Sequence, residues 1–318
     1  DESSLICDKL EEILSMDYPE SNLKILVIDS ASKDDTRNKS EKYLSENSGN
    51  IDWEVVHVPM PGKSLAVNTA LGMIDTDFFV MTDVDSRLES DSLSKIISGF
   101  QNDDNIGAIC GSISISERTY MKNYRARFNL LRLRESAADS TPIFEGSICA
   151  FRTSAISSSR IYSEINADDS QLALLCRRNG YRAVMQEGIE FTEPIFPNKQ
   201  QRIRSLRRAQ GIVRVLLKNK DLSFGRKKFN RIFLQNLYFY VFMPWFFLLG
   251  SSISFWALSS LIYFEGFPPF AAIAFVAIFL TSGLVRGFLS GVALLIHSQL
   301  LLFLGVRLDE WKPFREIL

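Results

Sequence analysis

The sequence predicts an α/β domain with a mostly parallel sheet, followed by helices that cross a membrane. Three observations lead to this prediction. Short apolar runs alternate with helical segments over residues 1–199, several of these runs end at an aspartate, and residues 233–306 are dominated by apolar side chains. A basic segment at 200–232 lies between the two parts, and a short tail at 307–318 follows.

Strands and helices alternate along residues 1–199. Apolar runs predict strands at 24–29, 53–57, 78–82, 106–115, 148–152 and 181–185. Amphipathic or well-capped segments predict helices at 3–16, 34–45, 64–73, 120–138 and 168–179. An α/β domain normally opens with a strand, whereas this chain opens with a helix, so we expect that a first strand is missing from the sequence. In such folds ligands bind at the carboxyl ends of the strands.

Composition excludes several classes of protein. The 318 residues carry a formal net charge of -1, which provides no overall attraction for nucleic acid. The chain has two histidines, His57 and His297, which argues against a zinc site built on histidine. The four cysteines are widely spaced, and we interpret them as reduced thiols of a cytoplasmic domain.

The second half of the chain has the composition of a membrane anchor. Residues 200–219 combine apolar positions with five arginines, which predicts a basic amphipathic helix suited to an anionic membrane surface. Apolar stretches at about 237–264, 269–285 and 288–305 predict two or three membrane-spanning helices, a number that Arg286 leaves open. Basic residues from Arg226 to Arg231 precede the first span and place the domain before it in the cytoplasm, as part of a multi-pass protein of the cell membrane.

Asp83 and Asp85 are the most informative residues of the sequence. They follow the apolar run 78–82, at the carboxyl end of a predicted strand. Their carboxylates are hard ligands that select Mg²⁺ or Mn²⁺, and such a metal would bridge two phosphates. Alternate positions of an extended segment point to opposite sides, so we expect one carboxylate on the metal and the other on a ribose or a second water. A solvated turn is the alternative.

Two more residues follow predicted strands. Asp29 ends the strand at 24–29 and could hydrogen-bond a base or a ribose; alternatively, it opens an Asx-turn over residues 30–33. Lys63 stands in a Pro-Gly-Lys loop after the strand at 53–57 and could face phosphate oxygens; alternatively, it is an exposed loop lysine.

A second acidic pair, Asp168 and Asp169, begins the helix predicted at 168–179. N-capping explains one of these acids, while the other is available as a general base toward a hydroxyl. The helix dipole favours the ionised form of that base. In the basic helix, Arg207 is the arginine best placed to reach a diphosphate leaving group, with contact to a membrane surface as the alternative role of the helix.

These residues together resemble the inverting family 2 glycosyltransferases, whose catalytic domain has the GT-A fold. Four segments resemble motifs of that family and occur in its order: Ile-Leu-Val-Ile-Asp-Ser-Ala-Ser-Lys-Asp-Asp-Thr, Pro-Gly-Lys-Ser-Leu-Ala-Val-Asn-Thr-Ala-Leu, Thr-Asp-Val-Asp-Ser and Asn-Ala-Asp-Asp-Ser-Gln-Leu-Ala-Leu-Leu. The resemblance covers the chain to about Gly211. It implies that Asp29 contacts the nucleotide, Asp83 the nucleotide-sugar and Asp85 the metal, and that Asp169 is the base.

The resemblance also places Glu145, Gly146 and Ser147 near the acceptor. The sequence departs from the family pattern in its absent opening strand, in Asp168, where glutamate is usual, and in the QxxRW motif of processive members. That motif is replaced by Arg204-Ser205-Leu206-Arg207-Arg208, without the glutamine and the tryptophan. In processive members the tryptophan helps to hold the growing glycan.

The loss of that tryptophan favours a single transfer. The resemblance therefore implies a metal-dependent enzyme that moves a sugar from a nucleotide-diphospho-sugar to a hydroxyl or phosphate of a lipid-linked or glycan acceptor. The apolar tail points to the lipid-linked case. A processive polysaccharide synthase and a catalytically inactive membrane scaffold of the same fold are the alternatives.

Overall fold

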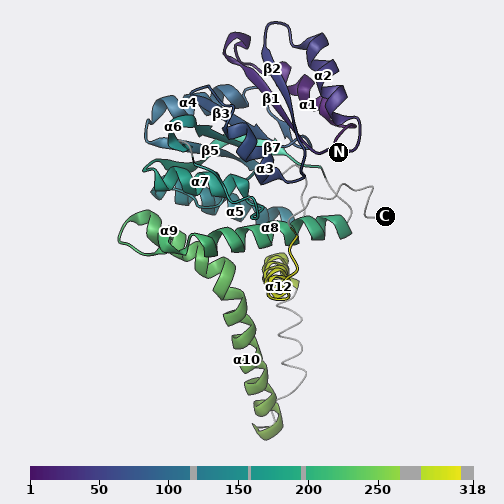
Figure 1. Ribbon diagram of the computed structural model, residues 1–318. Coiled ribbons are helices and arrows are strands. Elements are labelled where there is room, and N and C mark those ends of the chain that lie inside the picture. Colours follow the sequence, from purple (N-terminus) through teal and green to yellow (C-terminus); the bar gives the residue numbers. More distant parts are fainter. Residues whose placement is uncertain (115–119, 157–158, 195–197, 266–280, 309–318) are drawn as a thin grey trace.

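The computed structural model describes residues 1–114, 120–156, 159–194, 198–265 and 281–308 (Figure 1). An α/β domain forms the upper part of the view in Figure 1. Helix α8 (Asn198–Lys218) runs beneath this domain, and α10 (Met243–Glu265) projects away from it. The described chain is therefore a layered domain from which one apolar helix projects, and we call this helix, α10, the apolar stalk.

The first part of the domain is a parallel pair of strands. β1 (Lys24–Ser30) and β2 (Asp52–Val58) pair so that Asp29 lies opposite His57. Three helical elements accompany the pair: α1 (Ile6–Leu14), the 3₁₀ turn η1 (Glu20–Asn22) and α2 (Thr36–Asn47). The apolar positions that predicted these elements form a buried cluster of their own: Ile6, Leu10, Ile25, Leu44 and Ile51.

A second sheet has five strands in the order β3-β6-β5-β7-β4. These are β3 (Phe78–Thr82), β6 (Ile148–Arg152), β5 (Ile106–Ile113), β7 (Arg182–Thr192) and β4 (Arg87–Leu88). β5 and β7 pair in parallel, but β6 is antiparallel to both β3 and β5, and β4 is antiparallel to β7. The prediction of a mostly parallel sheet is therefore wrong. The sheet is mixed because β6, which follows the long helix α5 (Tyr120–Ala138), enters between β3 and β5 in the reverse direction.

Helices cover both faces of this sheet. Cys149 and Phe151 of β6 pack with α7 (Asp168–Arg178), whereas the alternate residues Ile148 and Ala150 pack with α4 (Ser92–Asn102). Two shorter helices contact α7: α3 (Lys63–Leu71) and α6 (Thr153–Ile156). The four cysteines are free, as expected, and three of them are buried in the core.

Helix α8 lies inside the protein. Most of its residues from Leu206 to Leu216 are buried, on all sides of the helix. The turn η2 (Lys220–Ser223) and helix α9 (Lys228–Leu237) follow, and α9 packs against α8 through Phe229 and Phe233. The predicted role of this basic helix on a membrane surface does not fit α8, because protein covers the apolar side chains that would face lipid.

Two helical segments among the described residues are long and apolar enough to cross a membrane, Lys228–Ser260 and α12 (Gly283–Phe303). The first joins α9, the π-helical turn η3 (Tyr238–Phe242) and α10. In the α10 part of this segment many large apolar side chains are exposed, with Phe255 at 74% and Trp256 at 72%. The predicted first and third spans thus correspond to helices, and the second, at 269–285, falls mostly outside the described residues.

Candidate active site

The turn after β3 carries the predicted metal-binding pair, Asp83 and Asp85. Ser86, which is fully buried, closes this turn by donating from its Oγ to the carbonyl of Asp83 at 2.8 Å. Thr82 Oγ1 and Ser86 Oγ also donate to the carbonyl of Ser147, at 2.8 and 3.2 Å. Since β3 and β6 are neighbours, the turn lies beside the loop that enters β6.

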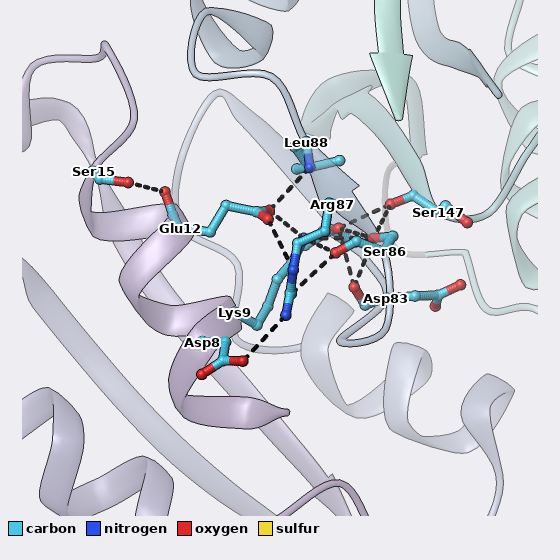
Figure 2. A network of polar contacts seen from close by, with 10 residues as sticks. Asp8, Lys9, Glu12, Ser15, Asp83, Ser86, Arg87, Leu88 and Ser147 are labelled. Atoms are coloured by element: carbon cyan, nitrogen blue, oxygen red, sulfur yellow. Dashed lines mark hydrogen bonds and ion pairs between the residues drawn. The ribbon is translucent and has the colours of Figure 1, made fainter. Parts of the chain in front are cut away.

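Helix α1 supports this turn, as Figure 2 shows. Lys9 is 2% exposed, and its Nζ donates to the carbonyl of Ser86 at 3.1 Å and to Glu12 at 2.7 Å. Glu12 also accepts the backbone N–H of Leu88 at 3.2 Å. Neither residue is among the site residues predicted from the sequence, although a lysine on the apolar face of a predicted helix signals a buried charge that needs partners.

Lys63 joins the two acidic pairs. Its Nζ lies 2.6 Å from Asp83 Oδ1 and 3.5 Å from Asp168 Oδ2. Burial acts to lower the pKa of Lys63, but the carboxylates of Asp168 and Asp83 raise it above its ordinary value, so the ammonium stays charged. Its side chain is 44% exposed, so it is accessible to a ligand as well as to these carboxylates.

Asp168 and Asp169 begin α7 without capping it. The N-cap residue is Ala167, and no side chain caps this helix. Asp168 is 5% exposed, and its Oδ2 has no hydrogen-bond partner within the described chain. One oxygen of Asp169 accepts the backbone N–H of Ser170 at 2.7 Å, and the other faces Gly146, where an added Cβ would meet it at 3.2 Å. N-capping therefore does not explain the pair.

The surroundings of Asp169 favour its protonated form. Burial raises the pKa of Asp169 to about 7, with a further contribution from Asp168 and an opposing one from Lys63. We expected the helix dipole to favour the ionised carboxylate; the structure corrects this, because desolvation and a like charge outweigh the dipole. A carboxyl group that titrates near pH 7 is well matched to general-base chemistry.

Three arginines of α8 lie along the other side of the site. Arg204 Nη2 is 3.0 Å from Asp85 Oδ2, and Arg208 Nη2 is 2.5 Å from Glu193 Oε1. Arg207 makes no ion pair among the described residues, and burial together with the two neighbouring arginines lowers its pKa. Arg207 is therefore the arginine that an anionic ligand could most readily engage.

The structure splits the predicted acceptor loop. Gly146 lies against Asp169, as noted above, whereas Glu145 is paired with Arg132 of α5. Ser147 is 1% exposed and donates to Glu193 at 3.0 Å. The side chain of Ser147 is thus engaged by Glu193, and its carbonyl holds the turn after β3. The position of this loop near an acceptor stays a prediction.

Asp29 is engaged by other protein groups at the end of β1. It is 4% exposed, its Oδ2 lies 2.8 Å from His57 Nδ1, and its Oδ1 accepts the backbone N–H of Ser32 at 3.3 Å. Burial acts to raise the pKa of Asp29, but the hydrogen bonds with Ser32 and His57 lower it below its ordinary value. Asp29 thus bonds the loop backbone as the Asx-turn alternative expected, but at the third residue on instead of the second, and Ala31 within this loop has a strained φ of +54°.

Comparison with known proteins establishes the family. The sequence profile described as Glycosyl transferase family 2 matches residues 1–159, which is half of the chain. The chain belongs to glycosyl transferase family 2. The matched residues form a glycosyltransferase domain, and they include Asp29, Lys63, Asp83 and Asp85.

Solved structures support the same fold for this family 2 chain. The mannosyltransferase PcManGT from Pyrobaculum calidifontis, in complex with GDP-Man and Mn²⁺, matches with a TM-score of 0.81 and 27% identity, over 95% of this chain and 84% of that one. Residues 1–349 of TarS from Staphylococcus aureus, in complex with UDP-GlcNAc, match with a TM-score of 0.52 and 16% identity, over 75% of this chain and 68% of that one. The predicted α/β fold of GT-A type is confirmed at this level.

Curated relatives include poly-β-1,6-N-acetyl-D-glucosamine synthases. The protein of Staphylococcus epidermidis is 24% identical over 162 residues, which are 49% of this chain. That of Staphylococcus aureus is 23% identical over 240 residues, which are 72% of this chain. These matches span 38% and 56% of the lengths of the two relatives.

A divalent metal, which membership of this family implies, fits the turn after β3. Within the described ranges no three His, Cys, Asp or Glu side chains form a cage for a metal. Asp83 and Asp85 still offer carboxylate oxygens from one turn, which suits Mg²⁺ or Mn²⁺ when phosphates and waters complete the coordination shell. Lys63 and Arg204, the present partners of these carboxylates, would compete with the metal for them.

Proposed function

We propose that this protein is a membrane-bound inverting glycosyltransferase that makes a single transfer from a nucleotide-diphospho-sugar to a lipid-linked acceptor. The position of Lys63, 2.6 Å from Asp83 and 3.5 Å from Asp168, carries the proposal. It unites the donor-binding carboxylates and those of the proposed base in one site. The similarity to PcManGT, whose structure contains GDP-Man and Mn²⁺, supports a donor of this class and a divalent metal.

The donor lies at the carboxyl ends of β1 and β3 in this proposal. Asp85, with Asp83, holds the metal, which supplies positive charge to the leaving diphosphate when it is bound. Lys63 and Arg207 neutralise phosphate oxygens from two sides of the site. Asp29 contacts the nucleoside from the end of β1.

Asp169 acts as the general base in this proposal. It accepts the proton of the acceptor hydroxyl, and the hydroxyl oxygen bonds to the anomeric carbon as the bond from that carbon to the diphosphate breaks. Attack from the face opposite the leaving group inverts the configuration. Asp168 helps to hold the pKa of Asp169 near 7, where it can accept a proton at neutral pH. A phosphate acceptor is already an anion and would need Asp169 less.

The apolar stalk supports a lipid-linked acceptor. α10 exposes large apolar side chains from Phe246 to Tyr263, which a bilayer would cover. The basic residues from Arg226 to Arg231 precede this helix and favour a cytoplasmic position for the catalytic domain. A multi-pass or single-pass anchor would thus hold the enzyme at the inner face of the cell membrane, where it would act.

A processive polysaccharide synthase is the second candidate. The similarity to poly-β-1,6-N-acetyl-D-glucosamine synthases favours it. Two observations favour a single transfer instead. Arg208 replaces the tryptophan of the processive motif, and the apolar residues of α10 are open rather than packed around a channel within the described chain.

A donor screen tests the proposal. The detergent-purified full chain would be incubated with GDP-mannose, UDP-GlcNAc and other nucleotide sugars, with Mn²⁺ or Mg²⁺, and with or without a membrane lipid extract. We expect metal-dependent release of nucleoside diphosphate that rises with lipid, with one sugar per acceptor by mass spectrometry. A ladder of products would favour the synthase. Release no greater than that of Asp85→Ala with every donor would favour an inactive scaffold.

A further inference from the structure

Helices α10 and α12 cross instead of running side by side. Trp245 of α10 donates from Nε1 to Gln299 Oε1 at 2.8 Å, and its ring lies 6.5 Å from that of Phe303. Phe247, two residues further along α10, lies 5.2 Å from Phe288 at the other end of α12. Phe288 and Gln299 are separated by about 16 Å along α12 at 1.5 Å per residue. Two residues about 3 Å apart along α10 can meet both positions only if α12 passes across α10.

Figure 1 shows the same arrangement. α12 is seen end-on beneath α8, whereas α10 is seen along its length as it leaves the domain. The contacts with α12 come from the first turns of α10, at Trp245 and Phe247, and the later residues Ile253, Phe255 and Trp256 are exposed. If α10 crosses the bilayer, α12 therefore lies along the bilayer surface.

One side of α12 is covered by protein over most of its length. Its buried residues run from its second turn to the turn before its last: Gly287, Val292, Ser298 and Gln299. α12 contacts both α5 and α8. Gln210 of α8, which is fully buried, donates to the carbonyls of Ser298 and Val306 at 3.3 and 3.1 Å and accepts the N–H of Leu308 at 2.9 Å. A helix crossing the bilayer could not keep this contact with the polar domain along its length.

The other side of α12 is open. Its exposed residues include Ala293, Leu300 and Phe303, followed by Leu304 at its C-cap, with Arg286 and Arg307 exposed near the two ends. In Figure 1, α12 lies beneath α8, on the side of the domain from which α10 projects. An apolar strip bounded by basic residues matches the boundary between acyl chains and anionic headgroups.

We infer that α12 is an interfacial helix that lies flat in the surface of the membrane, between α8 and the lipid, and that it is not a span. This rests on the membrane location proposed above and deepens it. The lipid surface is the partner of the exposed strip. α12 is apolar enough to be predicted as a third span because one of its sides packs against protein and the other faces lipid.

Spin-label depth measurements test this inference. In a Cys7→Ser background, single cysteines would be placed along one strip of α12 and its C-cap, at Ser290, Ala293, Leu300 and Leu304. A matched set on α10 also spans fourteen residues, at Leu249, Ile253, Trp256 and Tyr263. The labelled protein would be reconstituted in anionic vesicles, and the collision of each label with oxygen and with a water-soluble nickel chelate would give its depth.

We expect the four labels on α12 to lie at one shallow depth, within a few ångströms of each other. Those on α10 should differ by about 20 Å, the length of fourteen helical residues. A comparable spread of depths on α12 would overturn the inference while leaving the membrane anchor intact. Labels accessible to water throughout α10 would overturn the anchor itself, and with it the position of α12. Each variant would first be shown to bind nucleotide like the parent.

Discussion

Arg204 and Arg208 occupy the two positions at which processive family members have glutamine and tryptophan. Each makes an ion pair at the site, Arg204 with Asp85 and Arg208 with Glu193. The departure from the motif therefore puts two arginines, each held in an ion pair, where processive members have a glutamine and the tryptophan that contacts the glycan. At this scale the sequence identified the substituted positions, but the partners of the arginines depend on how α8 packs, which no local pattern specifies.

Arg204→Gln should strengthen metal binding in the absence of donor. The substitution removes a cation that competes for Asp85, and a partly buried ion pair is worth roughly 1 kcal/mol, so we expect the Kd for Mn²⁺ to fall about three- to tenfold. Electron paramagnetic resonance of free Mn²⁺ would measure it. Arg202→Gln, on the same helix but without contact to Asp85, is the matched control. Weaker binding in Arg204→Gln would mean that Arg204 orients Asp85 for the metal.

Asp169→Asn should reduce kcat by about 10²- to 10⁴-fold with a hydroxyl acceptor, since the asparagine cannot accept the proton. Nucleotide affinity, measured by calorimetry, should stay within about twofold of the parent. Asp221→Asn changes an exposed carboxylate paired with Arg178, away from the site, and should leave kcat unchanged. A parental rate in Asp169→Asn would show that the acceptor needs no base, as expected of a phosphate.

The raised pKa of Asp169 predicts opposite effects of pH on rate and on stability. The ordinary pKa is 3.8 and that in the folded protein about 7, so between these values the folded state holds the proton more tightly than the unfolded state. From pH 4 to 7, stability should therefore fall by up to roughly 1.4 kcal/mol per pH unit, while kcat rises and levels off above pH 7. Melting temperatures and rates of the parent and of Asp169→Asn, compared over this range, would check both. If the parent and Asp169→Asn showed the same dependence of melting temperature and of rate on pH, the titration of Asp169 would not be the cause of either dependence.

At the scale of elements, α1 acts as a support for the metal-binding turn. Lys9→Met removes the ammonium that holds the carbonyl of Ser86 and leaves Glu12 without its closest cation. We expect a loss of about 1–3 kcal/mol, seen as a lower melting temperature, and weaker Mn²⁺ binding because the turn at Asp83 loosens. Lys39→Met on α2, an exposed lysine bonded to the carbonyl of Ser3, is the control. Lost stability with unchanged Mn²⁺ affinity would limit Lys9 to a role in folding.

Most helices and strands could be predicted from the sequence, but whether neighbouring strands run parallel or antiparallel could not. The predicted ranges 78–82, 120–138 and 148–152 match β3, α5 and β6 residue for residue. Hydrophobic periodicity reports which residues are buried, but it is the same for a strand and for its reverse, so β6 was assigned to a mostly parallel sheet. The basic pattern of 200–219 likewise gave a helix correctly and could not distinguish arginines that face lipid from arginines that face Asp85 and Glu193.

At the scale of the whole molecule, Gln210 links α12 to α8, the helix that carries the arginines of the site. Its amide holds Ser298, Val306 and Leu308 from α8, two residues after Arg208. Gln210→Leu leaves the carbonyl of Val306 and the N–H of Leu308 without these hydrogen bonds, and it should lower stability by about 1–3 kcal/mol for each group that water does not reach. We expect a lower melting temperature and faster proteolysis after α12. Gln201→Leu, on the less buried first part of α8, is the control, and equal effects of both would remove the special role of Gln210.

The stacking of α8 directly on α12 has a consequence for which acceptors the enzyme can use. If α12 rests among the headgroups, the arginines of α8 stand about one helix diameter, roughly 10 Å, above them, and the domain cannot swing further away without breaking the contacts of Gln210. The distance between the active site and the membrane surface is then fixed. An acceptor whose reactive oxygen sits close to its lipid will reach the site, and one carried on a long rigid spacer will overshoot it, however well its sugar or phosphate is recognised.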